Sequence, residues 1–516
     1  MGEIKKFKRV LVANRGEIAI RVFRACRELG IRTVAIYSEE DKNSLFRTKA
    51  DEAYQIGKGK TPVGVYLSID EIIALAKAKG VDAIHPGYGF LAENVEFAKA
   101  CQDAGIEFIG PTAEMMDRLG DKIKSKIVAS DVGVPTIPGV EKAITTEEEA
   151  VEFAEKCGYP VMLKAAAGGG GRGMRIVQNA EELLPQFRSA RSEAAKAFGI
   201  DDIFIEKYLE NPKHIEVQIL GDKYGNIVHL FERDCSIQRR HQKVIEFTPA
   251  LCLSDQQRED ICQDALKIAH AVDYRSAGTV EFLVDKTGQH YFIEMNPRIQ
   301  VEHTVSEIVT GIDIVQDQIL VAQGYALNSP EIAIPDQDAI KVTGHAIQCR
   351  ITTEDPANGF MPDTGIIENY RSPGGFGIRL DGGNGFEGSE ITPFYDSLLV
   401  KVTAFSRTFE DTRRKAIRAL SEMVIKGIKT NVAFMLNVLN HPTFAAGMCD
   451  TGFIANTPDL LNIEKVEDNE LKVIEFLGNK FVNETKGHKP QFNVPVFPKF
   501  KKEELSGLRG TKQLLD

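Results

Sequence analysis

A chain of 516 residues is too long for one hydrophobic core, so we expect several domains of roughly 100 to 200 residues each. Its net charge of −11 argues against a nucleic-acid-binding protein, which needs clustered Lys and Arg to displace phosphate counterions. No apolar run reaches the roughly 20 residues of a membrane span, and the first strand begins at once, which leaves no room for a signal peptide. We expect a cytoplasmic chain, or a mitochondrial one whose presequence was removed.

The first hundred residues alternate two kinds of apolar pattern. RVLVAN, RTVAIYS, DAIHPG and EFIGP predict strands, while IAIRVFRACRELG and SIDEIIALAKAKG predict helices. This alternation indicates βαβ units, and therefore a parallel sheet with helices on its faces. NRGEIA follows the first strand but lacks the GxGxxG pattern of a dinucleotide site.

A second α/β unit begins near Gly120. GDKIKSKIVASDVG predicts a helix, and it is followed by the strand YPVMLKAA, a helix near 181–198 and the strand DIFIEKYL. IEVQILGD and NIVHLFERD alternate with period two, which indicates an antiparallel hairpin. From about Lys341 a β-rich section leads to a helix near 412–421, and the sequence after about Pro458 is polar, as in a linker.

A glycine-rich segment follows the strand that ends at Lys164. Its residues Gly168, Gly169, Gly170 and Gly171 leave backbone N–H groups free to approach an anion, which suits a flap over phosphates. It is not a Walker loop, because the GxxxxGK[ST] pattern is missing. A mobile loop without a ligand is the alternative, and the nearby lysine favours the phosphate-binding interpretation.

Two expected strands, GTVEFLVD and HYFIEMNP, carry acidic residues that a hairpin brings together. We expect Asp285 to pair with His290. That register places Glu281 opposite Glu294, and alternation puts Asn296 on the same face as Glu294. Facing carboxylates repel unless a cation lies between them, and two carboxylates with an amide oxygen suit Mg²⁺ or Mn²⁺. The alternative is the solvated face of a surface hairpin.

A polar row continues from this hairpin if the chain stays extended past its proline. The row then consists of Glu294, Asn296, Arg298, Gln300 and Glu302. Such a row offers a metal site at one end and, at the other, an arginine for an anion and a carboxylate as base. An ordinary amphipathic edge strand gives the same alternation.

A third segment, ERDCSIQRRHQKVIE, is basic within an acidic protein. It offers Gln238, His241 and Lys243 as a local anion site, although a charged hairpin surface gives the same pattern. Cys235 in this segment predicts a small buried side chain, and Arg350 taken alone predicts a routine salt bridge.

Taken together, a series of long motifs resembles the biotin carboxylase family over nearly the whole chain. The motifs are NRGEIAIR, HPGYGFLAEN, FIGP, GDK, KAAAGGGGRGM, EKYLENPKHIEVQ, ERDCSIQRRHQKVIE, EFLVD, EMNPRIQVEHTVSE and CRITTEDP. The resemblance implies a multidomain α/β and α+β chain with an ATP-grasp fold. The implied domains are a Rossmann-like N-terminal domain over 1–119, an ATP-grasp domain over 120–335 with a glycine-rich lid at about 138–206, a C-terminal biotin carboxylase domain over 336–458, and a linker over 459–516.

The resemblance also implies a role for individual residues. Those expected to contact ATP are Lys122, Lys164, Gly168, Gly169, Gly170, Gly171, Glu206, Lys207, Leu209, His214, Gln238 and His241. The expected metal ligands are Glu281, Glu294 and Asn296, and the expected bicarbonate pocket consists of Lys243, Arg298, Gln300 and Val301. Glu302 would deprotonate bicarbonate, which then attacks the γ-phosphate to give carboxyphosphate, and Arg350 would stabilise the enolate-like biotin.

Within the family, VEHT, RSPGGFGIRLDGGNG, ITPFYDSLLVKV and GTKQLLD are similar to pyruvate carboxylases. The alternative is the biotin carboxylase subunit of an acetyl-CoA or another acyl-CoA carboxylase, and remoter ones are a different ATP-grasp ligase and a catalytically silent scaffold. An AMKM-like attachment motif is missing, so we expect biotin on a separate carrier domain or as the free molecule. The expected partners are that carrier and a carboxyltransferase domain, with a homodimer through this domain and a tetramer of the full-length protein.

Overall fold

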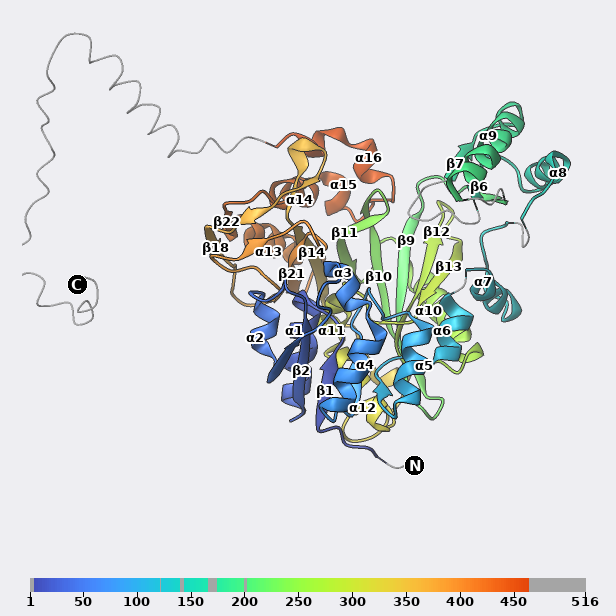
Figure 1. The fold of residues 1–516 in the computed structure, drawn as a ribbon. Coiled ribbons are helices and arrows are strands. Elements are labelled where there is room, and N and C mark those ends of the chain that lie inside the picture. The colour runs from blue at the N-terminus through green and yellow to red at the C-terminus, as the bar shows by residue number, and fades with distance from the viewer. Residues whose placement is uncertain (1–3, 121, 140–142, 166–173, 199–201, 464–516) are drawn as a thin grey trace, which may run out of the picture. The chain divides into compact units, whose positions relative to one another are not determined.

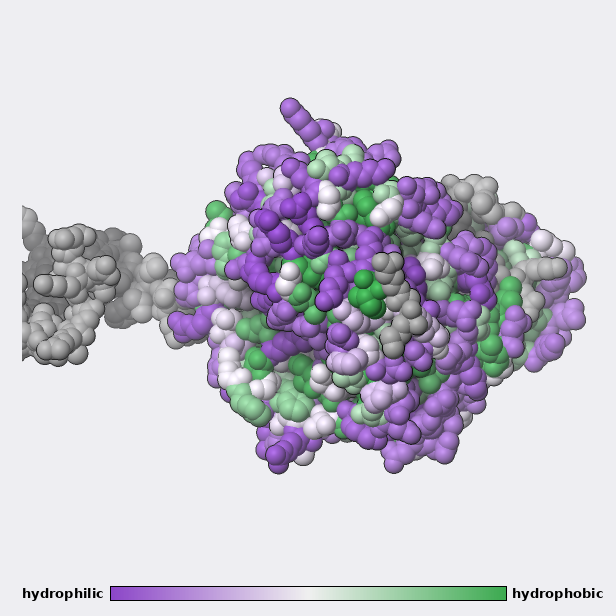
Figure 2. All heavy atoms as spheres, turned by 90° about the horizontal axis from the view of Figure 1, so that it is seen from below, coloured by the Kyte–Doolittle hydropathy of each residue, from purple (hydrophilic) through white to green (hydrophobic). Residues whose placement is uncertain are grey.

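The computed structural model describes residues 4–463, with the exception of residues 121, 140–142, 166–173 and 199–201. The predicted lid glycines Gly168 to Gly171, the side chain of Lys122 and the expected linker after residue 463 lie outside the described residues. Within the described part, no helix has both the length and the apolar character that a membrane span requires. The face drawn in Figure 2 is mainly hydrophilic, with its hydrophobic residues in scattered groups.

The N-terminal part forms a parallel sheet, as predicted. It has five strands in the order β3–β2–β1–β4–β5, and its edge strand β3 was not among the predicted strands. The strands are β1 (Arg9–Val12), β2 (Arg32–Tyr37), β3 (Glu52–Gln55), β4 (Ala83–His85) and β5 (Glu107–Phe108). The helices around this sheet are α1 (Gly16–Glu28), α2 (Leu45–Lys49), α3 (Pro62–Tyr66), α4 (Ile69–Ala78) and α5 (Val95–Asp103). The chain order reverses between β1 and β4, and ligands of such sheets bind at the carboxyl ends of the strands beside this reversal.

A three-stranded antiparallel sheet follows, in the order β7–β6–β8. Its strands are β6 (Val161–Ala165), β7 (Met174–Val177) and β8 (Ile203–Lys207). The helices α6 (Ala113–Gly120) and α7 (Lys122–Asp131) precede this sheet in the chain, and α8 (Glu147–Cys157) and α9 (Ala180–Phe198) pack against it. Figure 1 shows α8 and α9 beside this sheet, and a capping box of Thr146 and Glu149 begins α8. The helix predicted near 181–198 is confirmed as α9.

The largest element is an antiparallel sheet of eight strands in the order β13–β12–β9–β10–β11–β14–β21–β19. Its strands are β9 (Lys213–Gly221), β10 (Ile227–Arg239), β11 (Gln242–Thr248), β12 (Ser276–Val284), β13 (His290–Asn296), β14 (His345–Thr352), β19 (Ile378–Gly382) and β21 (Leu398–Ser406). The predicted β9–β10 hairpin is confirmed. Because β11 pairs with β14, one sheet runs across the expected boundary near residue 335, and the domain limits stay a prediction.

The β12–β13 hairpin reaches the expected glutamate pair by an unexpected route. Val284 pairs with His290, so the predicted pairing of Asp285 with His290 was wrong. A β-bulge in β13 then takes up one extra residue and shifts the register back. Glu281 therefore lies opposite Glu294, as predicted, because the bulge compensates for the error at the turn.

Helices cover the eight-stranded sheet and complete its core. They are α10 (Asp255–Ala271), α11 (His303–Thr310), α12 (Ile314–Gln323), α13 (Phe409–Glu422), α14 (Val432–Asn440), α15 (Pro442–Ala445) and α16 (Phe453–Asn456). Short 3₁₀ turns lie at Gln337–Ala339, Pro356–Asn358 and Pro458–Leu461. The remaining strands form small pairs: β15 (Glu354–Asp355), β16 (Met361–Pro362), β17 (Gly365–Ile366), β18 (Asn369–Arg371), β20 (Glu390–Ile391) and β22 (Val424–Lys426). Phe247, Phe409 and Phe444 pack together where α13 and α15 meet the sheet.

Candidate active site

A cleft of about 1340 Å³ is lined by residues of the parallel-sheet region, of the three-stranded sheet and of the eight-stranded sheet. Asn14 and Tyr88 reach it from the segments that follow β1 and β4, the carboxyl ends identified above. Lys164 reaches it from the three-stranded sheet, and Glu281 and Arg350 reach it from the eight-stranded sheet. The large sheet provides its most densely charged wall.

Three glutamates form a row across neighbouring strands of this wall. Glu281 of β12 lies opposite Glu216 of β9 on one side and opposite Glu294 of β13 on the other. Directly opposed carboxylates destabilise a sheet unless cations compensate them. Lys243 of β11 supplies one cation, because its Nζ lies 2.5 Å from Oε2 of Glu216 and 2.8 Å from Oε1 of Glu281. The fully buried Arg233 supplies another, with Nε 2.5 Å from Oε1 of Glu216.

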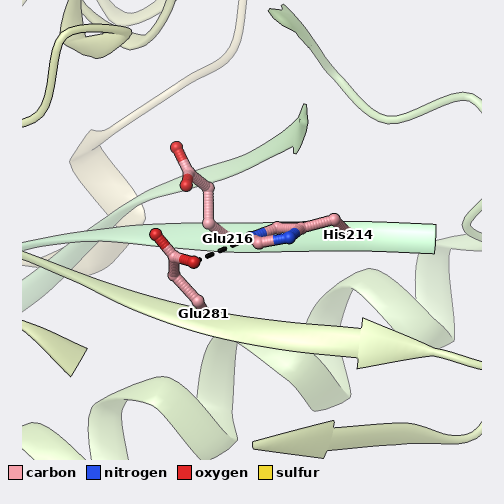
Figure 3. Close-up of side chains that lie close together, drawn as sticks. All are labelled: His214, Glu216 and Glu281. Atoms are coloured by element: carbon pink, nitrogen blue, oxygen red, sulfur yellow. Dashed lines mark ion pairs between the residues drawn. The ribbon is translucent and has the colours of Figure 1, made fainter. Parts of the chain in front are cut away.

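His214 joins this row from β9. Figure 3 shows the imidazole of His214 and the carboxylate of Glu281 pointing toward one another, with Glu216 beside them. Nε2 of His214 lies 2.8 Å from Oε2 of Glu281, and the side-chain nitrogen of Gln238 lies 2.9 Å from Nδ1 of His214. With the Gln238 amide donating, Nδ1 is the acceptor and the proton of a neutral ring lies on Nε2, facing Glu281. The predicted nucleotide contacts His214 and Gln238 therefore act on each other in this structure.

Glu302 lies between two cations at the inner end of the cleft. Its Oε1 is 2.8 Å from Nζ of Lys243, and its Oε2 is 2.8 Å from Nη2 of Arg350. Burial opposes ionisation of this fully buried carboxyl group, but Lys243 and Arg350 outweigh burial and hold its pKa well below the usual value. Glu302 is therefore charged at neutral pH and free of a proton, as a base must be before it acts.

Arg350 is shared with a second buried carboxyl group. Its Nε lies 2.5 Å from Oε1 of Glu246, and Gln348 donates to the other oxygen of Glu246 at 2.8 Å. Burial raises the pKa of Glu246 to about 7, although Arg350 opposes the rise. One arginine thus faces two carboxylates, and Glu246 is the one that takes up a proton more readily.

The predicted metal ligands come together on β12 and β13. Nδ2 of Asn296 donates to Oε1 of Glu281 at 2.9 Å, and the register sets Glu294 opposite Glu281. Burial opposes ionisation of Glu281, but Lys243 and His214 lower its pKa far below the usual value. Ionised carboxylates and an amide oxygen are the hard donors that Mg²⁺ and Mn²⁺ prefer. The donor set therefore fits a divalent cation at this hairpin.

The polar row beyond the hairpin is present, but it is not an extended strand. β13 ends at Asn296, a turn includes residues 301–302, and α11 begins at His303, so the strand on which the row was conditional does not continue. Arg298, Gln300 and Glu302 still line the cleft. The turn, and not strand alternation, directs Glu302 into the site.

Arg298 and Gln300 are held by their neighbours in the row. Nε of Arg298 lies 2.9 Å from Oε2 of Glu93, and its Nη2 donates to Oδ1 of Asn296 at 3.1 Å. Nε2 of Gln300 donates to Oε1 of Glu281 at 3.1 Å. Lys243 and Val301, the other two residues of the expected bicarbonate pocket, also line the cleft. The predicted pocket residues thus share one wall.

The expected nucleotide contacts on and just after β6 and β8 form the outer part of the cleft, whereas His214 and Gln238 lie beside Glu281 on the charged wall. The residues of the expected set that line the cleft are Lys164, Glu206, Lys207, Leu209, His214, Gln238 and His241. Lys164 forms an ion pair with Glu206, and Lys126 lies 3.4 Å from the same carboxylate. Nζ of Lys207 donates to the carbonyl oxygens of Gly158 and Tyr159 at 3.0 and 2.9 Å, so this ammonium is directed at backbone.

Three family models match successive parts of the chain. Residues 6–116 match the biotin carboxylase N-terminal domain, and residues 348–456 match the biotin carboxylase C-terminal domain. Residues 121–330 match the ATP-binding domain of the carbamoyl-phosphate synthase L chain.

Solved structures match this fold along most of its length. The biotin carboxylase subunit of a pyruvate carboxylase is 49% identical, with a TM-score of 0.79, over 89% of this chain and 100% of that chain. The biotin carboxylase domain dimer of 2-oxoglutarate carboxylase from Hydrogenobacter thermophilus, in complex with MgADP, ADP and bicarbonate, is 49% identical, with a TM-score of 0.82, over 88% and 99%. The chain belongs to the biotin carboxylase family. The predicted ATP-grasp fold of that family is confirmed.

Among curated relatives, the pyruvate carboxylase of Bacillus subtilis is 54% identical over 99% of this biotin carboxylase chain. The chain spans 45% of the length of that relative. The family is therefore established for this chain, whereas the longer relative contains further polypeptide that this chain does not match.

Sequence reasoning missed several buried charges of this biotin carboxylase site. Glu216 pairs with Lys243 and Glu246 pairs with Arg350, both of which were predicted. Arg233 pairs with Glu216, and all three missed residues are fully buried. A signal for Glu216 existed, since strand alternation in HIEVQ places it on the same face as His214. Arg233 lies opposite Glu216 in the hairpin of β9 and β10, which the sequence predicted, so alternation along that hairpin was a signal for it as well. No comparable signal existed for Glu246, because its partner Arg350 lies on a strand that is distant in sequence.

Proposed function

We propose that the chain catalyses the ATP- and bicarbonate-dependent carboxylation of biotin through a carboxyphosphate intermediate. In this proposal the reaction is the first half-reaction of a pyruvate carboxylase, which makes oxaloacetate. The observation that carries the proposal is the buried Glu302 between Lys243 and Arg350. Similarity to a pyruvate carboxylase over 99% of the chain favours this branch over a biotin carboxylase subunit of an acetyl-CoA or another acyl-CoA carboxylase.

We assign ATP to the outer part of the cleft and bicarbonate to its inner end. The neighbour from Hydrogenobacter thermophilus is in complex with MgADP and bicarbonate, which supports these ligand classes. The residues proposed to contact ATP are Lys122, Lys164, Gly168 to Gly171, Glu206, Lys207, Leu209, His214, Gln238 and His241. Glu281, Glu294 and Asn296 are the proposed ligands of Mg²⁺ or Mn²⁺, which when bound neutralises charge on the phosphates.

Glu302 is the proposed base for bicarbonate. Burial alone would raise the pKa of Glu302, but the positive charges of Lys243 and Arg350 hold it far below the usual value. Glu302 is therefore charged but weakly basic in this structure. Bicarbonate bound beside Arg298 and Lys243 brings a second negative charge close to Glu302 and shares Lys243 with it. A nearby like charge raises the pKa of a carboxylate, so substrate binding itself makes Glu302 a better proton acceptor.

The proposed reaction has two stages, formation of carboxyphosphate and carboxylation of biotin. Glu302 takes the proton of bicarbonate, a bicarbonate oxygen bonds to the γ-phosphorus, and the bond to ADP breaks to give carboxyphosphate. Carboxyphosphate then decomposes to CO₂ and phosphate, and the phosphate accepts the ring N–H proton of biotin. The resulting nitrogen anion attacks CO₂ while Arg350 stabilises negative charge on the ureido oxygen. Because an acyl phosphate hydrolyses readily, the cleft must exclude water during this sequence.

The partners follow from the same proposal. The greater length of the curated relatives supports a biotin carrier domain and a carboxyltransferase domain as partners. A homodimer is supported by the dimeric neighbour, and a tetramer is proposed for the full-length protein. The domain limits at 119, 335 and 458 and a cytoplasmic or mitochondrial-matrix location complete the proposal.

The experiment that tests the function is ADP release from MgATP and bicarbonate, measured with and without free biotin. The proposal predicts release that depends on bicarbonate and increases with biotin. The proposal would be contradicted if neither free biotin nor a separately added biotinylated carrier increased ADP release. That outcome would indicate a different ATP-grasp reaction. Glu302→Gln is the matched variant, because it keeps the shape of the side chain and removes the basic charge.

A further inference from the structure

One lysine of the site region has no place in the proposed mechanism, although it is fully buried. Lys401 lies in β21, inside the eight-stranded sheet, with no exposed side-chain surface. An ammonium group taken out of water costs several kcal/mol unless it is paired and hydrogen-bonded. Its pairing therefore indicates what the group does in the fold.

Lys401 lies in a row of charged residues across three strands. Its neighbour on β14 is Arg350, and its neighbour on β19 is Asp381. Two cations opposite one another on adjacent strands destabilise a sheet, so anions must compensate both. Arg350 has Glu302 and Glu246, whereas Lys401 is paired with a residue outside the sheet.

The ammonium of Lys401 makes two contacts that connect distant segments. It donates to the carbonyl oxygen of Val301 at 3.0 Å, and it lies 2.9 Å from Oε1 of Glu17. Val301 belongs to the turn between Gln300 and Glu302, directly before α11. Glu17 is the second residue of α1, in the segment that follows β1. Lys401 thus ties the turn that carries Glu302 to the start of α1, in the parallel-sheet region.

The Glu17 end of this connection also lines the cleft. The hydroxyl group of Tyr88, in the segment after β4, donates to the same Oε1 of Glu17. Tyr88 and Glu17 both line the cleft. Lys401 therefore lies behind the cleft wall and bonds to backbone and side chains of residues that form it.

We propose that Lys401 is a positioning residue that fixes the turn at residues 300–302, and with it Glu302, against Glu17 and Tyr88 of the parallel-sheet region. The inference rests on the proposed carboxylation for its kinetic consequence. Its structural part, the restraint on the turn, is independent of which reaction the cleft catalyses.

The kinetic experiment compares Lys401→Met and Glu17→Gln in the full chain. Both remove the ion pair; Glu17→Gln keeps the side-chain length, and Lys401→Met shortens it by one atom. The expected result for Lys401→Met is a fall of at least about tenfold in kcat for biotin-stimulated ADP release, with KM for ATP within about twofold, because the proposed ATP contacts lie elsewhere. The double variant is expected to be no worse than Lys401→Met, since both changes break one connection.

Lys415→Met is the matched control. Nζ of Lys415 also donates to a carbonyl group of β21, that of Phe405 at 3.0 Å, but neither residue lines the cleft. A purely structural role for Lys401 predicts that the two lysine variants lose activity and thermal stability in the same proportion. That result, or an unchanged kcat in Lys401→Met, would overturn the proposal.

Hydrogen exchange of the turn decides the structural part without any turnover. The backbone N–H groups of His303 and Val305 donate to the carbonyl groups of Gln300 and Glu302. Lys401→Met is expected to speed exchange in the 297–305 segment, whereas Lys415→Met leaves it unchanged. Equal exchange in wild type and Lys401→Met would refute the restraint, even if the wild-type chain proves inactive with biotin.

Discussion

The two ends of the cleft use charged residues in different ways. At the inner end, Glu302 is fully buried and the side chain of Lys243 is only 13% exposed. At the outer end, on the three-stranded sheet, the side chain of Lys164 in its pair with Glu206 is 36% exposed. Charges that water cannot reach must be paired within the protein, whereas exposed pairs contribute little. At the inner end, the residues proposed for catalysis therefore also stabilise the fold. At the outer end, the residues proposed to bind the nucleotide contribute little to the stability of the fold.

The largest effect that this contrast predicts is the loss of stability in Lys243→Met. The change leaves Glu216, Glu281 and Glu302 buried without their shared cation. Breaking a buried pair by removing one partner costs about 3 to 5 kcal/mol, so we expect a loss of that size at pH 7. Urea denaturation measures it. The loss should shrink as the pH falls below about 5, because protonation neutralises the uncompensated carboxylates. A loss at pH 7 below about 1 kcal/mol would show that the inner pairs behave like surface pairs.

A buried carboxyl group outside the site gives the second prediction. Burial, together with the charges of Asp313 and Glu307, raises the pKa of Asp317 to about 8. The folded state therefore binds a proton that the unfolded chain releases near pH 4, so stability falls as the pH rises from about 4 to 8.

Asp317→Asn removes this dependence. We expect the variant to be more stable than the wild type by at least about 1 kcal/mol at pH 8, with the difference vanishing near pH 4. The matched control is Asp338→Asn, since Asp338 is exposed. Urea midpoints at both pH values measure the effect, and a difference independent of pH would show that desolvation is not its cause.

The smallest stability effect is expected at the outer end, in Lys164→Met. Its pair with Glu206 is partly exposed, so the variant should lose less than about 1 kcal/mol. The KM for ATP should instead rise about tenfold, because the ammonium is proposed to meet phosphate. Lys156→Met, an exposed change on α8, is the control. A large loss of stability without any change in the KM for ATP would show that Lys164 stabilises the fold and does not bind the nucleotide.

The sequence predicted local features of the fold well. The parallel sheet and α9 follow from apolar periodicity, which acts within a few residues. The pairing of Glu281 with Glu294 was right, although its premise was wrong, because a bulge offset the misplaced turn. A bulge depends on packing against neighbouring strands, so alternation alone gives no sign of it.

The contacts that complete the site were beyond sequence reasoning for a physical reason. A turn brings Glu302 to Lys243 and Arg350. These two cations lie on β11 and β14, which are distant in sequence and become neighbours only when the sheet forms. Lys401 lay within a motif used for the family resemblance, yet its bond to Val301 requires the complete sheet. Alternation predicts which face a side chain occupies, but not which distant strand lies beside it.

The most direct test of the account is the transfer of labelled bicarbonate to free biotin by wild type and Glu302→Gln, with MgATP and with nucleotide binding measured in parallel. The account predicts labelled carboxybiotin from the wild type. It predicts at least about a hundredfold less from Glu302→Gln, with ATP binding retained, because only the proton acceptor is lost. Transfer at the wild-type rate by Glu302→Gln would contradict the assignment of the base.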